Sequence, residues 1–230
     1  MKKLIKLSFF FSFLMLFVAC GDDDLEPTLA LDKDLSTGIN NAGDLQSVLN
    51  SAYDRMSATG YHGRNQIVMG DVRTDNAYST LNSNRFSDSD MEYSPTGSGP
   101  WTTIYGVIAI CNIVIGVDAA SLEGDQGLIN HTIGQAHAIR ALAHFDLLQD
   151  YGQHFVTGQG GAGALGVPYV KTYKDPANLT PARDTAASNL GDIVADLQGA
   201  IGLMNDAYNV STSYMLSLIH ISEPTRPRLI

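Results

Sequence analysis

Two neighbouring stretches in the middle of the chain have apolar residues at helical spacing. Residues 101–119 are apolar on nearly every side of a helix, which is typical of a helix at the centre of a bundle. Residues 125–151 form the strongest helical pattern of the chain, and Gly152 follows as a C-terminal cap. A central helix must be covered by other helices, so we expect a mainly α fold.

Three further stretches are expected to form helices: residues 44–56, residues 66–78, and a last helix that begins near Asp184 or Thr185. Asn41 or Asp44 can cap the first of them. The two long connections, residues 79–100 and 153–183, contain many turn-forming residues and are predicted to be irregular. The sequence therefore predicts four or five helices, some paired as antiparallel hairpins, with long loops.

The chain begins with a cationic segment and a short apolar run that ends at Ala19-Cys20. A spanning helix needs about 20 apolar residues, so residues 1–19 are predicted to be a cleaved secretory signal. The segment Phe17 to Cys20 resembles the bacterial lipobox, which implies lipidation of Cys20 and a lipid-anchored tether over residues 20–41. Several acyl chains anchor a protein almost permanently. The alternative is a plain secreted protein in which Cys20 falls at the cleavage site by chance.

The other end of the chain is expected to be foreign. Residues 216–230 resemble one reading frame of a sequencing adapter, which leaves residues 42–215 as one incomplete domain. Five of the 14 basic residues and one of the 24 acidic residues lie in the two end segments, so residues 20–215 hold nine basic and 23 acidic residues. This net charge of −14 argues against nucleic acid, whose phosphates require clustered Lys and Arg.

Cys20 and Cys111 are the only cysteines. If Cys20 is acylated, no intramolecular disulfide can form, and the fold depends on its core. Cys111 lies in an apolar segment and is interpreted as a small buried hydrophobe. Arg140 lies between apolar residues of a predicted helix, so we expect it to form a structural ion pair or carbonyl contact.

Three stretches are similar in order and spacing to motifs of the SusD/RagB family of surface lipoproteins: Trp101-x-x-x-Tyr105 with Asn112-Ile113-Val114, Gln135 to Leu147 with Tyr151-Gly152, and Gly166 to Val170 with Pro181 to Thr185 and Asp196 to Ala200. His137 and His144 replace the usual arginine and aromatic residue of the second stretch. The resemblance implies a SusD-like helical scaffold with tetratricopeptide-like hairpins. Because family members are considerably longer, it also implies that this chain is an amino-terminal fragment.

The resemblance further implies a non-catalytic lipoprotein on the outer face of the outer membrane. Such a protein captures glycans, or in some members peptides, for a SusC-like TonB-dependent transporter and needs no cofactor. Sugar binding requires aromatic faces and hydrogen-bonding side chains rather than a reactive group. Two alternatives are a surface glycoside hydrolase, for which Asp71 and Asp75 could supply carboxylates, and an assembly protein that binds peptides along its helical hairpins.

The loop region before Trp101 holds the candidate ligand contacts: Asp75, Asn76, Tyr78, Arg85 and Tyr93. Asp75 and Asn76 resemble a family signature there, although they can equally cap a helix. Trp101 could stack on a sugar ring, but its place in an apolar helix favours core packing.

Overall fold

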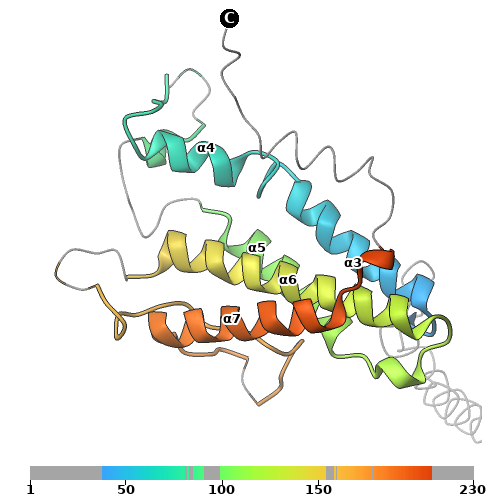
Figure 1. Cartoon of the computed structure of the whole chain (residues 1–230). Helices are drawn as coiled ribbons and strands as arrows, with labels where there is room; N and C mark the ends of the chain where they lie inside the picture. The colour runs from blue at the N-terminus through green and yellow to red at the C-terminus, as the bar shows by residue number, and fades with distance from the viewer. Residues whose placement is uncertain are drawn as a thin grey trace, which may run out of the picture. The chain divides into compact units, whose positions relative to one another are not determined.

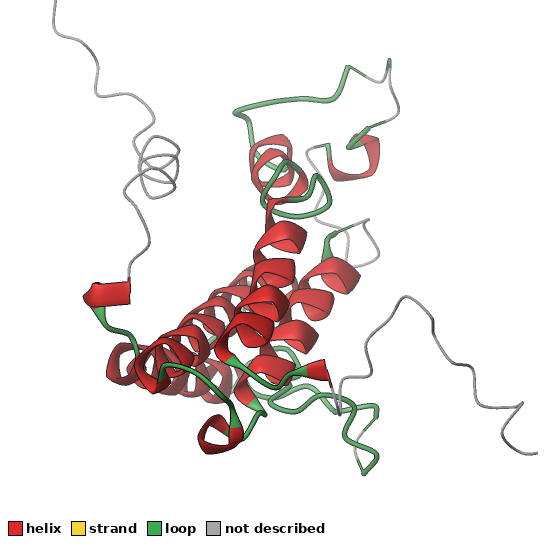
Figure 2. Ribbon diagram, turned by 90° about the vertical axis from the view of Figure 1, so that its right-hand side faces the viewer, coloured by secondary structure: helices red, strands yellow, loops and turns green. Residues whose placement is uncertain are grey.

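The computed structural model describes residues 38–80, 82, 85–90, 99–153, 158, 160–177 and 179–208. Five α-helices lie within them: α3 (Ala42–Ser57), α4 (Asn65–Val72), α5 (Trp101–Ile115), α6 (Gln126–Tyr151) and α7 (Ala186–Leu203). Three short 3-10 helices lie at Ser87–Ser89, Ala119–Ser121 and Asp206–Tyr208. The described part of the chain contains no strand, as Figure 2 shows. It has two isolated β-bridges, Asn41 with Glu123 and Leu165 with Thr185. The mainly α prediction is confirmed.

Four of the five described helices, α3, α5, α6 and α7, pack side by side. The helix α7 packs against α6, α6 against α5, and α5 against α3 (Figure 1). The pair α5 and α6 is antiparallel, because Trp101 at the start of α5 lies against Tyr151 at the end of α6. The pair α6 and α7 is antiparallel too, with Gly134 beside Leu203.

The helix α5 is central, as its apolar pattern predicts. Ile104, Val107, Ile108, Cys111 and Val114 are all fully buried on it. Burial raises the pKa of the Cys111 thiol to about 12, so this side chain is the inert apolar residue expected from the sequence.

Most helix starts agree with the predicted caps. The Asn41 side chain accepts a hydrogen bond from the Asp44 N–H at 3.0 Å, and the Thr185 side chain accepts one from the Ser188 N–H at 3.1 Å. At the other end of α6, Gly152 follows the last residue as predicted. Its φ of −75° and ψ of 153° are extended, however, so it is not the left-handed cap that glycine often provides.

The predicted helix at residues 66–78 is too long, because α4 ends at Val72. The Thr74 hydroxyl donates to the Asp71 carbonyl at 2.9 Å, a local bond that competes with continued helix. Residues 74–78 consequently lie in a turn and loop. The central helix is also shorter than predicted, since α5 ends at Ile115.

None of the described helices combines the length and hydropathy needed to cross a bilayer. The predicted signal at 1–19, the lipidated Cys20, most of the tether, Tyr93 and the tail at 216–230 lie outside the described residues.

Candidate ligand-binding pocket

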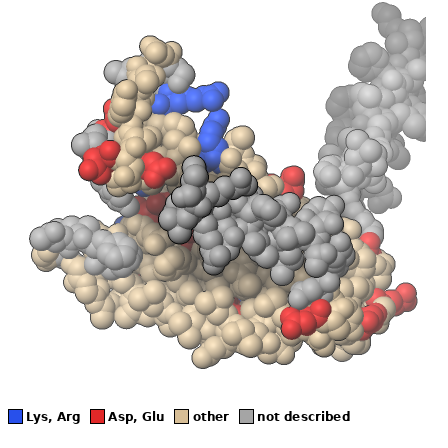
Figure 3. All heavy atoms as spheres, turned by 45° about the horizontal axis from the view of Figure 1, so that its top comes forward, with Lys and Arg blue, Asp and Glu red and all other residues tan. Residues whose placement is uncertain are grey.

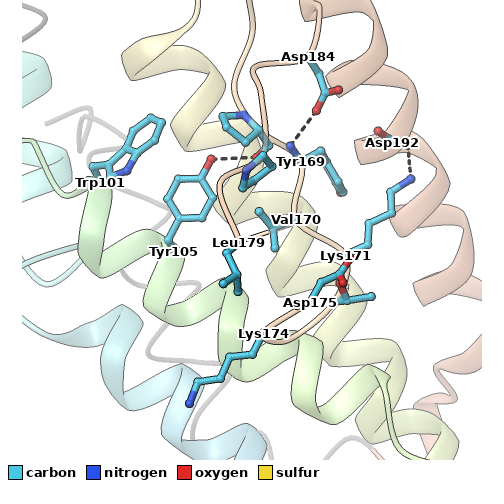
Figure 4. A pocket seen from close by; sticks show the side chains of 13 residues that line it. Trp101, Tyr105, Tyr169, Val170, Lys171, Lys174, Asp175, Leu179, Asp184 and Asp192 are labelled. Atoms are coloured by element: carbon cyan, nitrogen blue, oxygen red, sulfur yellow. Dashed lines mark hydrogen bonds and ion pairs between the residues drawn. The ribbon is translucent and has the colours of Figure 1, made fainter. Parts of the chain in front are cut away.

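A cavity of about 720 Å³ opens between the start of α5, the segment from Pro168 to Asp184 and the start of α7 (Figure 4). Its lining combines aromatic rings with charged side chains: Trp101, Tyr105, Tyr169, Lys174, Asp175 and Asp192. Both apolar and polar groups therefore face the cavity.

Trp101 lines the cavity, and the prediction that it packs in the core is wrong. The residue is 36% exposed. Its ring contacts Tyr105 at a centroid distance of 4.9 Å and meets Tyr151 edge-on at 4.8 Å. Helical periodicity places Trp101 on an apolar face, but as the first residue of α5 it lies at the end of the bundle, where fewer helices cover it.

A buried ion pair between α6 and α7 lies beneath the cavity. Arg140 Nε and Nη2 donate to the two carboxylate oxygens of Asp196 at 2.8 and 2.6 Å, so the predicted ion pair of Arg140 is confirmed. The Tyr169 hydroxyl donates to Asp196 at 2.6 Å, and His137 Nδ1 lies 2.9 Å from it. Burial raises the pKa of the Asp196 carboxyl, but the hydrogen bonds from His137, Arg140 and Tyr169 outweigh burial and hold the pKa well below its usual range.

Two side chains fix the backbone of Val170 at the cavity floor. Asn112 Nδ2 donates to the Val170 carbonyl at 3.0 Å, while Asn112 Oδ1 accepts from Arg140 at 2.7 Å. His144 Nε2 accepts from the Val170 N–H at 3.1 Å, and its Nδ1 donates to the Arg140 carbonyl at 2.9 Å. The His144 ring also stacks on Tyr169 at 3.8 Å.

These contacts require a neutral His144. The fully buried imidazole accepts at Nε2 and donates at Nδ1, which the neutral Nδ1–H tautomer alone can do. Burial lowers the pKa of His144 to about 4, and the nearby Arg140 guanidinium also lowers it.

The ends of the Pro168 to Asp184 segment are fixed as well. The Tyr105 hydroxyl donates to the Pro168 carbonyl at 2.8 Å, and the Asp184 carboxylate accepts from the Tyr169 N–H at 2.9 Å. Arg183 donates to the carbonyls of Gly166 and Tyr151. The segment is irregular, as predicted, yet side chains of three helices determine its path.

A family model described as "Starch-binding associating with outer membrane" matches residues 25–217. The chain belongs to the SusD-like family. The three stretches that resemble the family motifs in the sequence contact one another at the cavity floor. Asn112 of the first stretch bonds to Arg140 of the second and to Val170 of the third, and Arg140 pairs with Asp196 of the third. No curated protein matches the chain.

Solved SusD-like structures share the fold. A SusD superfamily protein from Bacteroides vulgatus is 25% identical with a TM-score of 0.63, and the match covers 73% of this chain and 38% of that one. A second, from Bacteroides thetaiotaomicron, is 26% identical with a TM-score of 0.61, and covers 72% and 38%. A laminarin-binding SusD-like protein, 17% identical with a TM-score of 0.54, has a similar fold. The chain spans about 38% of the length of the first two structures.

The described residues predicted to contact a ligand, on the loop before α5, lie outside the cavity. Asp75, Asn76, Tyr78 and Arg85 are all exposed, and none of them lines the cavity. Among the described helices, none has Asp75 or Asn76 as its cap. The sequence reasoning missed Tyr169 and the segment around it, because their role depends on contacts with distant helices.

Two carboxylates that line the cavity are already bonded to other groups of the same chain. Asp192 pairs with Lys171 at 2.7 Å, and Asp175 accepts from the Ala177 N–H at 2.9 Å. Within the described ranges, no three His, Cys, Asp or Glu residues are placed to hold a metal ion. The face in Figure 3 carries acidic side chains in several small groups and basic ones in a single area.

Proposed function

We propose that the chain is the amino-terminal part of a non-catalytic surface protein that captures glycans for a SusC-like TonB-dependent transporter, with peptides as the alternative ligand. The observation that carries the proposal is the cavity in which the exposed Trp101 ring and the half-buried Tyr105 ring adjoin Asp175, Lys174 and Thr172. The family description, which names starch binding, and the laminarin-binding relative support a sugar as ligand.

The lining suits a sugar for a physical reason. A pyranose ring has apolar C–H faces that pack on aromatic rings, and its hydroxyls bond to carboxylate, ammonium and hydroxyl groups at the edge. Trp101 is a rigid platform, because its ring is supported by Tyr105 and Tyr151. Carboxylates with a protein partner still have lone pairs for a sugar hydroxyl.

Replacing Trp101 with alanine should weaken glycan binding by about tenfold, since loss of one stacked aromatic platform costs on the order of 1.4 kcal/mol. Isothermal titration with the glycan that binds the parent protein measures the effect, with circular dichroism as the check of the fold. Tyr53→Ala is the matched control, because Tyr53 is a similarly exposed aromatic residue on α3 that does not line the cavity. Equal affinity for Trp101→Ala and the parent would contradict the proposed site.

The loop residues Asp75, Asn76, Tyr78, Arg85 and Tyr93 stay a proposed second contact region. Tyr78, which is 77% exposed, can stack on a longer glycan that extends beyond the cavity. The same calorimetric titration, carried out with the Tyr78→Ala variant and a longer glycan, measures whether Tyr78 contributes to binding.

We also propose that lipid on Cys20 anchors the protein to the outer membrane, on the exterior side. Mass spectrometry of the mature amino-terminal peptide should find an acylated Cys20. Cys20→Ala should move the protein from the membrane to the soluble fraction, because the attached acyl chains supply the membrane affinity. An unmodified thiol in the parent protein would refute the anchor.

The glycoside hydrolase alternative has less support. Hydrolysis requires two carboxylates facing each other across a cleft at about 5–10 Å. Asp71 and Asp75 lie on exposed surface at the end of α4, and neither lines the cavity.

A further inference from the structure

Exposed apolar side chains gather on one side of α7. Leu190, Val194, Leu197 and Ile201 are between 42% and 74% exposed. Their spacing of i, i+4, i+7 and i+11 places them in one stripe along the helix. We call these four residues the α7 stripe.

Two exposed apolar residues of α6 lie on the same side of the helix pair. Asp196 marks the side of α7 that faces the cavity segment, and Arg140 marks that side of α6. At 100° per residue, the four residues of the α7 stripe lie about 120–180° from the mean direction of Asp192 and Asp196, and Leu142 and Phe145 lie about 140–160° from Arg140. Both groups therefore face away from the cavity.

Exposed apolar side chains are concentrated on this side of α6 and α7. Of the 14 large apolar side chains exposed in the described part of the chain, seven lie on α6, α7 or the residue after α7. The only charged residues of α7 are Asp192 and Asp196, which face the cavity segment. Contiguous apolar surface of this kind marks a site where another element packs.

We infer that the α7 stripe, with Leu142 and Phe145, is the seat of the segment that follows α7 in the full-length protein, and that this segment lies there as an amphipathic helix. The helix α6 packs antiparallel on α5, and α7 packs antiparallel on α6, so we expect the next helix along the chain to have α7 as its neighbour. The solved relatives are long enough to supply it, since this chain spans 38% of their length. An uncharged stripe fits an apolar helix face better than a polar ligand.

A photo-crosslinking residue in place of Ile201, the most exposed position of the stripe, tests the inference directly. The experiment uses full-length protein expressed from the uninterrupted gene, with the adduct mapped by mass spectrometry. We expect a link within the same chain to a residue beyond Tyr208. A link to a second copy or to a co-purified transporter, or no link at all, would overturn the inference.

A pair of substitutions gives an independent measurement. Val194→Asp should lower the Tm of the full-length protein by about 5 °C or more, because it buries an unpaired carboxylate. Ala195→Asp is the matched control: Ala195 is exposed on the adjacent position, outside the stripe, and should change Tm by about 1 °C or less. Equal shifts would count against the inference. Glycan affinity at the cavity is measured separately, so failure here is distinguishable from failure of the proposed function.

Discussion

Replacing Asp196 with alanine should lower the free energy of unfolding by about 3–5 kcal/mol, because the Arg140 guanidinium would remain buried without its carboxylate. Both side chains of the pair are less than a tenth exposed, and the two bidentate hydrogen bonds are 2.6 and 2.8 Å long. Tyr169 would lose its acceptor as well. Urea unfolding followed by circular dichroism measures the change.

Asp192→Ala is the matched control for this prediction. Asp192 lies one helical turn before Asp196 on α7 and pairs with Lys171, whose side chain is 57% exposed. A solvent-exposed ion pair contributes about 1 kcal/mol or less. Similar losses for the two variants would show that burial of the Arg140 pair has no special role. The double variant Arg140→Met with Asp196→Leu should recover much of the loss, because no charge is left buried.

Lowering the pH from 7 to 4 should remove about 3 kcal/mol of stability through His144 alone. Its pKa is about 4 in the folded protein and about 6.5 in an ordinary environment. The folded state therefore binds fewer protons than the unfolded state between these values. The contribution is fully present above about pH 6.5 and is lost as the pH falls through 4.

The His144→Gln variant isolates this effect. A glutamine oxygen can accept the Val170 N–H in place of Nε2 and does not titrate. We expect the difference in unfolding free energy between parent and variant to change by about 3 kcal/mol from pH 7 to pH 4. Because Asp196 has a lowered pKa, its own loss of stability occurs at lower pH and is common to both proteins. A pH dependence that is the same in both would refute the neutral, buried His144.

Local sequence predicts the helices of this chain but not the partners of their side chains. Apolar periodicity predicts α3, α5, α6 and α7, because each pattern is repeated over several turns. Arg140 in an apolar helix requires a counter-charge, so an ion pair is predictable from burial alone. Its partner Asp196 lies 56 residues away on another helix, and only the packing of α6 on α7 identifies it.

The site is less predictable than the fold for the same reason. The cavity is formed by a segment without regular structure, whose path depends on Tyr105, Asn112 and His144 from elsewhere in the chain. Periodicity assigns Trp101 to the core, whereas exposure depends on where the helix ends in the bundle. The loop at residues 75–93 has the composition of a ligand-binding loop, but composition does not place it beside a cavity.

Capture of glycan without cleavage is the central claim, and one paired measurement tests it. Full-length protein is titrated with a panel of polysaccharides by calorimetry, and the same mixtures are then assayed for reducing ends. We predict saturable binding of at least one polysaccharide, weakened by Trp101→Ala, with no release of reducing ends. Release of reducing ends by the purified protein, or no binding to any glycan in the panel, would contradict it.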